Sequence, residues 1–153
     1  MSQLRIAQLA KFVGPTSGGM RTAIEHLGQG YADAGADRIV ITPGERDTVT
    51  GTEAGTVIRM KAPKVGGGYR LITDPWKVID TLERFRPTTV EISDKSTLLP
   101  VARWARRSDI GAVLYSSGEE SEHQVKSRGE RLGVGRAPLY LLAETCLEKI
   151  LGE

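Results

Sequence analysis

Short apolar runs alternate along the chain with longer stretches in which apolar residues recur every three or four positions. The first run, LRIAQLA at 4–10, predicts a buried strand, and the periodic stretch at 20–35 predicts a helix that ends at Gly35. One face of this helix would carry Met20, Ala23, Ile24, Leu27 and Tyr31. The chain is therefore expected to begin with a strand followed by a helix.

The same alternation continues through the rest of the sequence. Further strands are predicted at 38–43, 56–63, 88–93 and 110–117. Further helices are predicted at 74–87, 96–109 and 138–151. The polar, turn-rich segments at 44–55 and 118–136 are expected to be irregular. The strand at 56–63 has one more polar face, which favours a place at or near the edge of a sheet.

Two of the helices have start signals. Asp74 is a suitable N-cap for the second helix, and Pro75 suits its first position. The apolar face of that helix would contain Trp76, Ile79, Leu82 and Phe85. Ser96 is the expected cap of the third helix.

The order of strands and helices predicts an α/β fold. Alternating strands and helices form a mostly parallel sheet with helices on both faces, which is a Rossmann-like, doubly wound arrangement. A chain of 153 residues fits one domain, and no shift in composition marks a linker. We therefore expect 1–153 to be a single domain.

Composition and charge exclude several classes of protein. The net charge of +2 is too small and too mixed to indicate a nucleic-acid-binding protein. The single cysteine, Cys146, excludes an intramolecular disulfide, and no metal-ligand pattern occurs. With no apolar run of transmembrane length and no secretory signal, we expect a cytoplasmic protein. The basic cluster RWARR at 103–107 fits either a solvated helix face or peripheral contact with the inner face of a membrane.

A glycine-rich loop joins the first strand to the first helix. In FVGPTSGGM at 12–20, Gly14, Gly18 and Gly19 would let backbone N–H groups approach an anion at the helix N-terminus. The spacing matches neither G-x-G-x-x-G nor G-x-x-x-x-G-K-[ST], so a dinucleotide fingerprint and a P-loop are disfavoured. The loop suits a phosphate or a sugar hydroxyl, although the glycines would also serve a simple turn.

Other polar residues follow or lie within the predicted strands. Asp94 and Lys95 come directly after one strand and would either project at the carboxyl edge of the sheet or cap a helix. In GGGYR, Tyr69 and Arg70 would either bind a sugar and a phosphate or belong to a flexible turn. Glu91 would either reach the cleft or lie on a polar rim.

Several of these segments together resemble a known family. The opening 4–44, the segment GGYRLITDPWKVIDTLERFRPTTVEISDKSTL and the RWARR cluster resemble retaining glycosyltransferases of the GT-B fold, family 4. The branch with phosphatidylinositol mannosyltransferase-like proteins is the most similar, and the resemblance is strong over 4–117. It implies that the chain is the N-terminal, acceptor-side half of a two-domain enzyme whose C-terminal donor-binding domain is absent here.

The resemblance also implies a reaction and a set of site residues. The enzyme would transfer a hexose, with mannose as the first expectation, from a nucleoside diphosphate sugar such as GDP-mannose. The acceptor would be a hydroxyl of a lipid, an inositol or a sugar, and the anomeric configuration would be retained. The donor is a substrate, so no cofactor is expected. Gly18, Gly19 and Arg21 would lie near the diphosphate, and Tyr69, Arg70, Asp94 and Lys95 would shape the acceptor side.

The sequence departs from the family after its last predicted buried strand. The family has a Ser-His-Glu-Arg-Leu-Asp-like motif there, whose histidine lines the catalytic cleft. Here Ser117 takes the place of the histidine, and His123 follows six residues later, after three glutamates. Either residue is a candidate for the catalytic position, with His123 more typical of a surface histidine.

These departures leave alternative functions open. A cleft with only one wall would bind donor weakly, so we expect the chain alone to be inactive. It would then be an inactive or truncated binding or regulatory module that needs a partner, either a missing C-terminal domain or a second copy of itself. An unrelated Rossmann-like reductase or hydrolase is disfavoured because G-x-G-x-x-G and G-x-S-x-G are both missing.

Overall fold

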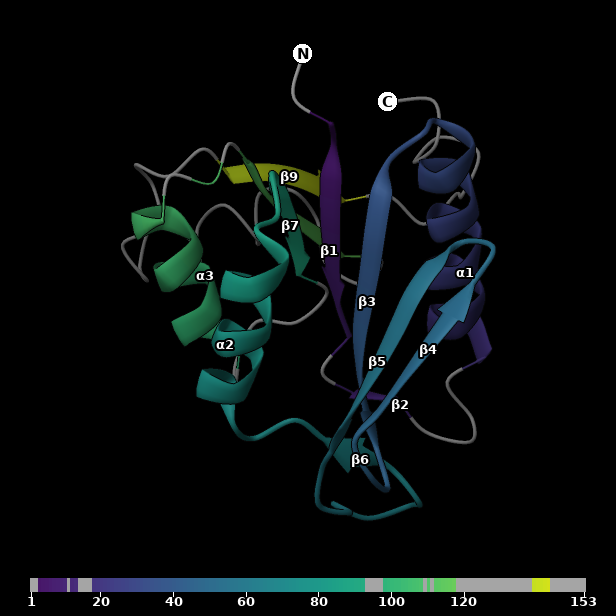
Figure 1. Ribbon diagram of the computed structural model, residues 1–153. Coiled ribbons are helices and arrows are strands. Elements are labelled where there is room, and N and C mark those ends of the chain that lie inside the picture. The colour runs from purple at the N-terminus through teal and green to yellow at the C-terminus, as the bar shows by residue number, and fades with distance from the viewer. Residues whose placement is uncertain are drawn as a thin grey trace.

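The computed structural model describes residues 3–10, 12–13, 18–92, 98–108, 110, 112–117 and 139–143, which form two sheets and three helices (Figure 1). The large sheet has the spatial order β4 (Thr48–Thr52), β5 (Gly55–Lys61), β3 (Asp37–Gly44), β1 (Arg5–Leu9), β7 (Thr89–Ile92), β8 (Ala112–Ser117) and β9 (Leu139–Ala143). The small sheet pairs β2 (Phe12–Val13) with β6 (Arg70–Leu71). The helices are α1 (Gly18–Asp33), α2 (Pro75–Phe85) and α3 (Leu99–Arg107).

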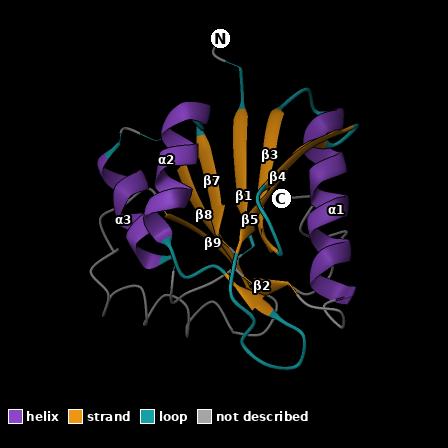
Figure 2. Cartoon of the chain, turned by 60° about the horizontal axis from the view of Figure 1, so that its bottom comes forward, coloured by secondary structure: helices purple, strands orange, loops and turns teal. Residues whose placement is uncertain are grey.

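The order of the strands is that of a doubly wound fold. From β1 the chain steps outward to β3 and β5, then crosses back and continues through β7, β8 and β9 on the other side of β1. Neighbouring strands are parallel except β4 and β5. Figure 2 shows α1 on one side of the sheet and α2 with α3 on the other. The predicted Rossmann-like α/β fold is confirmed.

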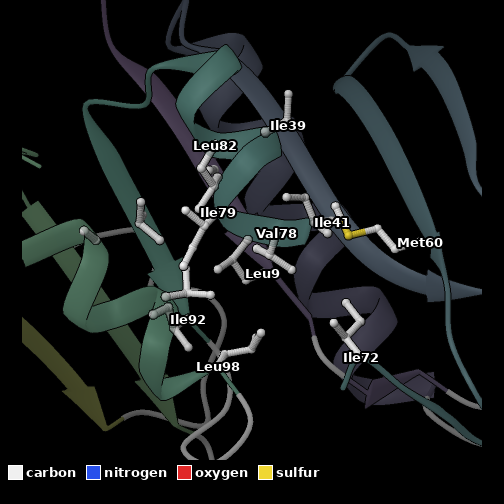
Figure 3. Packing of buried hydrophobic residues seen from close by; sticks show 14 of the residues in the cluster. Leu9, Ile39, Ile41, Met60, Ile72, Val78, Ile79, Leu82, Ile92 and Leu98 are labelled. Carbon is white, nitrogen blue, oxygen red and sulfur yellow. The ribbon is translucent and has the colours of Figure 1, made fainter. Parts of the chain in front are cut away.

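Successive side chains of the central strands point to opposite faces of the sheet, so the two faces carry different sets of residues. The face that α2 and α3 cover is apolar, and Figure 3 shows side chains from β1, β3 and β7 meeting those of α2. The strand residues in this core are Ala7, Leu9, Ile39, Ile41, Met60, Val90 and Ile92, and the α2 residues are Val78, Ile79 and Leu82. This contiguous cluster is the main hydrophobic core of the described domain.

The predicted start of α2 is confirmed. The side chain of Asp74 accepts hydrogen bonds from the backbone N–H groups of Trp76 (3.0 Å) and Lys77 (3.3 Å), and Pro75 occupies the first turn. Because Pro75 has no N–H, these are two of the three N–H groups at the helix start that lack an intrahelical partner. The helix ends at Arg86, whose φ of 54° is left-handed and whose N–H bonds the Leu82 carbonyl.

The predicted apolar face of α2 is wrong at one position. Trp76 is 71% exposed, and Val78 is buried in its place beside Ile79 and Leu82. Because Trp76 lies in the first turn, at the end of the helix next to the loop from β6, it extends past the edge of the core. Helical spacing alone does not reveal where along the helix the covering sheet ends.

The segment predicted as a loop at 44–55 contains a strand. β4 pairs antiparallel with β5 and forms the edge of the sheet, so β5 is the second strand. The alternating threonine and valine residues of TVTGT favour a strand, and the turn before β5 uses Gly55 at a φ of 110°. The glycines and polar residues that suggested a loop belong to this exposed hairpin.

The helix predicted at 138–151 is contradicted over its first part. Residues Leu139–Ala143 form β9, which pairs in parallel with β8 in the register Val113↔Leu139 to Ser117↔Ala143. The run LYLLA is apolar at every position, so its periodicity fits a short buried strand as well as a helix. Pairing with β8 decided between them. The segment 118–136 and the rest of the predicted helix lie outside the described residues. Ser96 also lies outside them, but its prediction as the cap of α3 is wrong, because Leu98 occupies the N-cap position without a side-chain cap hydrogen bond.

Candidate functional site

The order of the strands places a topological switch point between β1 and β7, the position at which doubly wound sheets have a crevice. These two strands are neighbours, with Leu9 opposite Ile92 at their carboxyl ends. The chain leaves β1 toward α1 and leaves β7 toward α3, and these helices lie on opposite faces of the sheet (Figure 2). In doubly wound sheets such a switch point is where ligands bind. The described ends of the glycine loop, Phe12–Val13 and Gly18–Gly19, follow β1 in the chain.

Gly18 and Gly19 are the first two residues of α1. The helix has 16 residues and no acidic residue in its first turn, so nothing on that turn offsets the positive end of the helix dipole. Arg21, in the same turn, is exposed. This end of α1 is suited to an anion such as a diphosphate. Side chains from 11 to 20 lie outside the described part of the structure.

The small sheet brings the GGGYR segment to the glycine loop. β2 comes directly after β1 and pairs with β6 in the register Phe12↔Leu71 and Val13↔Arg70. Arg70 is half-buried and donates from Nη1 to the Ala62 carbonyl at 2.8 Å. Its side chain therefore holds the chain between β5 and β6 in place.

Tyr69 belongs to a defined turn. Its N–H donates to the Gly66 carbonyl at 2.9 Å, and its own carbonyl accepts from the N–H of Val65 at 2.9 Å. Gly66, Gly67 and Gly68 all have positive φ, which the turn requires. The segment is thus a hydrogen-bonded turn that β2–β6 pairing brings next to Phe12 and Val13, and the binding of a sugar by Tyr69 or of a phosphate by Arg70 stays a prediction.

The remaining predicted site residues are placed only in part. Ser117 is the last residue of β8, so its backbone lies at the carboxyl edge of the sheet, while its side chain is not described. Asp94, Lys95 and His123 lie outside the described residues. Asp94 and Lys95 follow β7 directly in the sequence, and β7 ends at the switch point.

The basic cluster RWARR lies away from this edge. It forms the C-terminal part of α3, which runs back toward the amino end of β8. Arg103, Arg106 and Arg107 are exposed, whereas Trp104 is partly buried and donates from Nε1 to Glu83 of α2 at 3.3 Å. The basic side chains of the cluster are therefore exposed on α3, and contact of this face with a membrane stays a prediction.

A buried polar cluster under α1 was not predicted as a unit. Gln8 on β1, Arg38 on β3 and Glu91 on β7 are 2%, 4% and 5% exposed. Arg38 Nε donates to Gln8 Oε1 at 2.5 Å, and Gln8 Nε2 donates to Glu91 Oε2 at 3.1 Å. Tyr31 of α1 donates its hydroxyl to the same Glu91 oxygen at 2.9 Å. Glu91 therefore neither reaches the cleft nor lies on a polar rim.

Burial dominates the electrostatics of this cluster. It raises the pKa of the Glu91 carboxyl, an effect that the hydrogen bonds from Tyr31 and Gln8 and the charge of Arg38 oppose. Burial also raises the pKa of Tyr31 and lowers that of the Arg38 guanidinium. The sequence did carry a signal for the cluster, because Gln8, Arg38 and Glu91 each lie in an apolar strand at a position that alternates away from the core.

The described residues contain no group of three or more His, Cys, Asp or Glu residues that could hold a metal ion. None of the helices in this part of the chain is long and apolar enough to cross a membrane.

Comparison with known proteins identifies the family. The family model described as "Glycosyl transferase 4-like domain" matches residues 18–146, which include every helix described above. The chain belongs to this glycosyl transferase 4-like family. The resemblance inferred from the glycine loop and the segment before α3 is thereby confirmed.

Curated relatives of this glycosyltransferase domain are of two kinds. A GDP-mannose-dependent alpha-(1-6)-phosphatidylinositol dimannoside mannosyltransferase of Mycobacterium tuberculosis is 38% identical over 117 residues, or 74% of this chain. The chain spans 30% of the length of that relative. The DNA repair protein RadA of Halalkalibacterium halodurans is 56% identical over 57 residues, or 37% of this chain and 12% of RadA. RadA of Campylobacter jejuni is 56% identical over 41 residues, or 27% of this chain and 9% of RadA.

Proposed function

We propose that this chain is the acceptor-side domain of a retaining GT-B hexosyltransferase that transfers mannose from GDP-mannose to a lipid, inositol or sugar hydroxyl. The observation that carries the proposal is the position of Gly18 and Gly19 at the N-terminus of α1, the helix that follows β1 in the chain. Backbone N–H groups there would stabilise the charge that develops on the leaving diphosphate. The donor and the lipid-linked acceptor are inferred from the name of the mycobacterial relative.

The acceptor would approach from the turn between β5 and β6. This turn lies next to the glycine loop through the β2–β6 pairing. Apolar surface is exposed on the same edge, with Val65 at 48% and Trp76 at 71%. An acceptor that carries a lipid would gain from contact with such side chains. Tyr69 and Arg70 would set the position of the turn, with Asp94 and Lys95 contributing from the end of β7.

Ser117 supports a second candidate function. The family resemblance places a histidine of the catalytic cleft where this chain has serine, and a serine cannot take over the charge of a protonated imidazole. We therefore propose that the chain by itself binds donor without transferring sugar. The donor-binding domain of a GT-B enzyme would have to come from elsewhere in the same protein or from a partner.

Binding of GDP-mannose by Gly19→Asp tests the glycine site. Titration calorimetry should show weak binding to the wild-type chain and a loss of at least about tenfold in affinity in Gly19→Asp, because a carboxylate would occupy the anion position. Gly51→Asp is the matched control. It introduces the same charge on exposed β4, where a side chain meets no other atom within 4 Å, and should bind as the wild type does.

Each outcome of this titration has a meaning. Equal affinity in the wild type and Gly19→Asp would remove the glycine loop from the proposal. No detectable binding of GDP-mannose to the wild type at millimolar concentration would contradict the donor assignment. Sugar transfer by the isolated chain to a phosphatidylinositol acceptor would contradict the second candidate and show that Ser117 does not prevent catalysis.

A further inference from the structure

Arg38 joins three elements that are far apart in the sequence. Its Nη2 donates to the Ile24 carbonyl of α1 at 3.1 Å, and its Nη1 donates to the Ala54 carbonyl of the β4–β5 turn at 2.8 Å. Its Nε bonds Gln8 of β1. All three nitrogens of one buried guanidinium are thus committed to different elements, and each bond is charge-assisted.

The helix is shaped to receive this side chain. Gly28 of α1 packs directly on the guanidinium of Arg38, so that a Cβ at this position would overlap it. Gly28 and Leu27 are the buried residues of the described part of α1, and Gly28 lies one turn after Ile24. A glycine in the middle of a helix costs stability relative to alanine, and close approach of another group is a reason to have one there.

Glu91 of β7, the second strand of the switch point, also connects α1 to the sheet. It accepts the Tyr31 hydroxyl from α1 and the Gln8 amide from β1. Helix α1 is therefore hydrogen-bonded to side chains from β3 and β7, both linked through Gln8 of β1. Strands β1 and β7 are the two whose carboxyl ends define the crevice. The first turn of the same helix carries Gly18 and Gly19.

We propose that Arg38 and Glu91 are positioning residues that fix α1 along its axis, so that its Gly18–Gly19 end stays at the β1–β7 crevice. An apolar interface would permit a helix to slide or rotate at modest cost, whereas directed hydrogen bonds to a buried guanidinium and carboxylate are satisfied in one position only. The identity of the ligand in this proposal rests on the proposed function. The position of α1 does not, because it is a property of the free chain.

Hydrogen exchange of the free chain tests the positioning directly. In Arg38→Met, amides from Thr22 to Leu27 should exchange about tenfold faster or more, while amides of α2 and α3 keep their protection. Tyr31→Phe, which removes one hydroxyl and is expected to fold, should show a smaller change at the same amides. Leu82→Ala is the control, because it destabilises the core on the opposite face and should not affect α1 selectively.

Affinity for GDP-mannose gives a second readout. Under conditions where each variant is folded, Arg38→Met should bind about fivefold or more weakly, and Leu82→Ala should bind as the wild type does. Unchanged α1 exchange in both Arg38→Met and Tyr31→Phe would overturn the positioning role. If the amides of α1 exchange faster in the variants but the wild-type chain binds no GDP-mannose, the positioning role is supported and the proposed function is contradicted.

The sequence after β8 supports an independent inference. The family resemblance is strong over residues 4–117. This segment is about as long as the part of the chain that matches the mannosyltransferase, which is 74% of the sequence. The family pattern breaks at Ser117, which leaves 36 residues, and the RadA matches cover between 41 and 59 residues of the chain. We infer that residues 118–153 are related to RadA and not to the glycosyltransferase. The family model nevertheless matches as far as residue 146, and this segment supplies β9, which pairs in parallel with β8.

This origin implies that His123 is not a displaced catalytic histidine. His123→Ala should therefore leave the affinity for GDP-mannose within about twofold of the wild-type value. Replacing 118–153 by the matching segment of Campylobacter jejuni RadA should keep the midpoint of thermal unfolding within about 4 °C of the wild-type value. A shuffled segment of the same composition should lower the midpoint by more than this amount. Weaker binding of GDP-mannose by His123→Ala would overturn the inference. It would also be overturned if the chain with the RadA segment unfolds while the chain with the shuffled segment stays folded.

Discussion

At the scale of single residues, Glu91 shows how burial controls an ionisable group. Its carboxyl is enclosed by Gln8 of β1 and Tyr31 of α1, and the nearest described charge that affects it is that of Arg38 on β3. Loss of solvation raises its pKa despite these partners. The folded chain therefore holds the proton of Glu91 more tightly than the unfolded chain does.

This pKa shift predicts how stability depends on pH. Because the pKa of Glu91 is raised on folding, its contribution to stability is fully present below the unfolded value of about 4.5 and is lost as pH rises through the folded value. Glu91→Gln, which keeps the shape and cannot ionise, should remove this loss. Urea unfolding of both proteins between pH 4 and pH 8 measures the effect, with Glu83→Gln on exposed α2 as the control. Parallel pH profiles for wild type and Glu91→Gln would contradict the prediction.

At the scale of elements, signals that act within a few residues were the most informative. Asp74 and Pro75 predicted the start of α2, since capping and a fixed φ depend only on neighbouring atoms. The strands β4 and β9 were missed for the opposite reason. Their sequences fit more than one local structure, and pairing with β5 and with β8 selected the strand.

The N-cap of α2 gives a prediction at this scale. Asp74→Ala leaves the N–H groups of Trp76 and Lys77 without their side-chain acceptor and should lower the free energy of unfolding by about 0.5–2 kcal/mol. Asp80→Ala removes an exposed carboxylate that pairs with Arg84 on the same helix and should cost no more than about 0.5 kcal/mol. Urea denaturation compares the two. A larger loss in Asp80→Ala than in Asp74→Ala would show that the cap is not the important contact.

At the scale of the whole molecule, the order of the strands gives the candidate site its place. Gly18, Tyr69 and Ser117 come from parts of the chain that are far apart in sequence, and the carboxyl edge of one sheet brings them to the same side. The two sides of the sheet then differ in character. One is an apolar core under α2 and α3, and the other holds polar side chains that connect α1 to three strands.

The sequence by itself determined the α/β class, most of the element order, the start of α2, the glycine loop and the family. These depend on periodicity, on short-range capping and on contiguous motifs, all of which are local properties. The tertiary structure alone decided that 48–52 and 139–143 are strands and that Trp76 is exposed. It also joined Arg38, Gln8, Glu91 and Tyr31, because hydrogen bonds between distant residues depend on strand order and register, which no local pattern encodes.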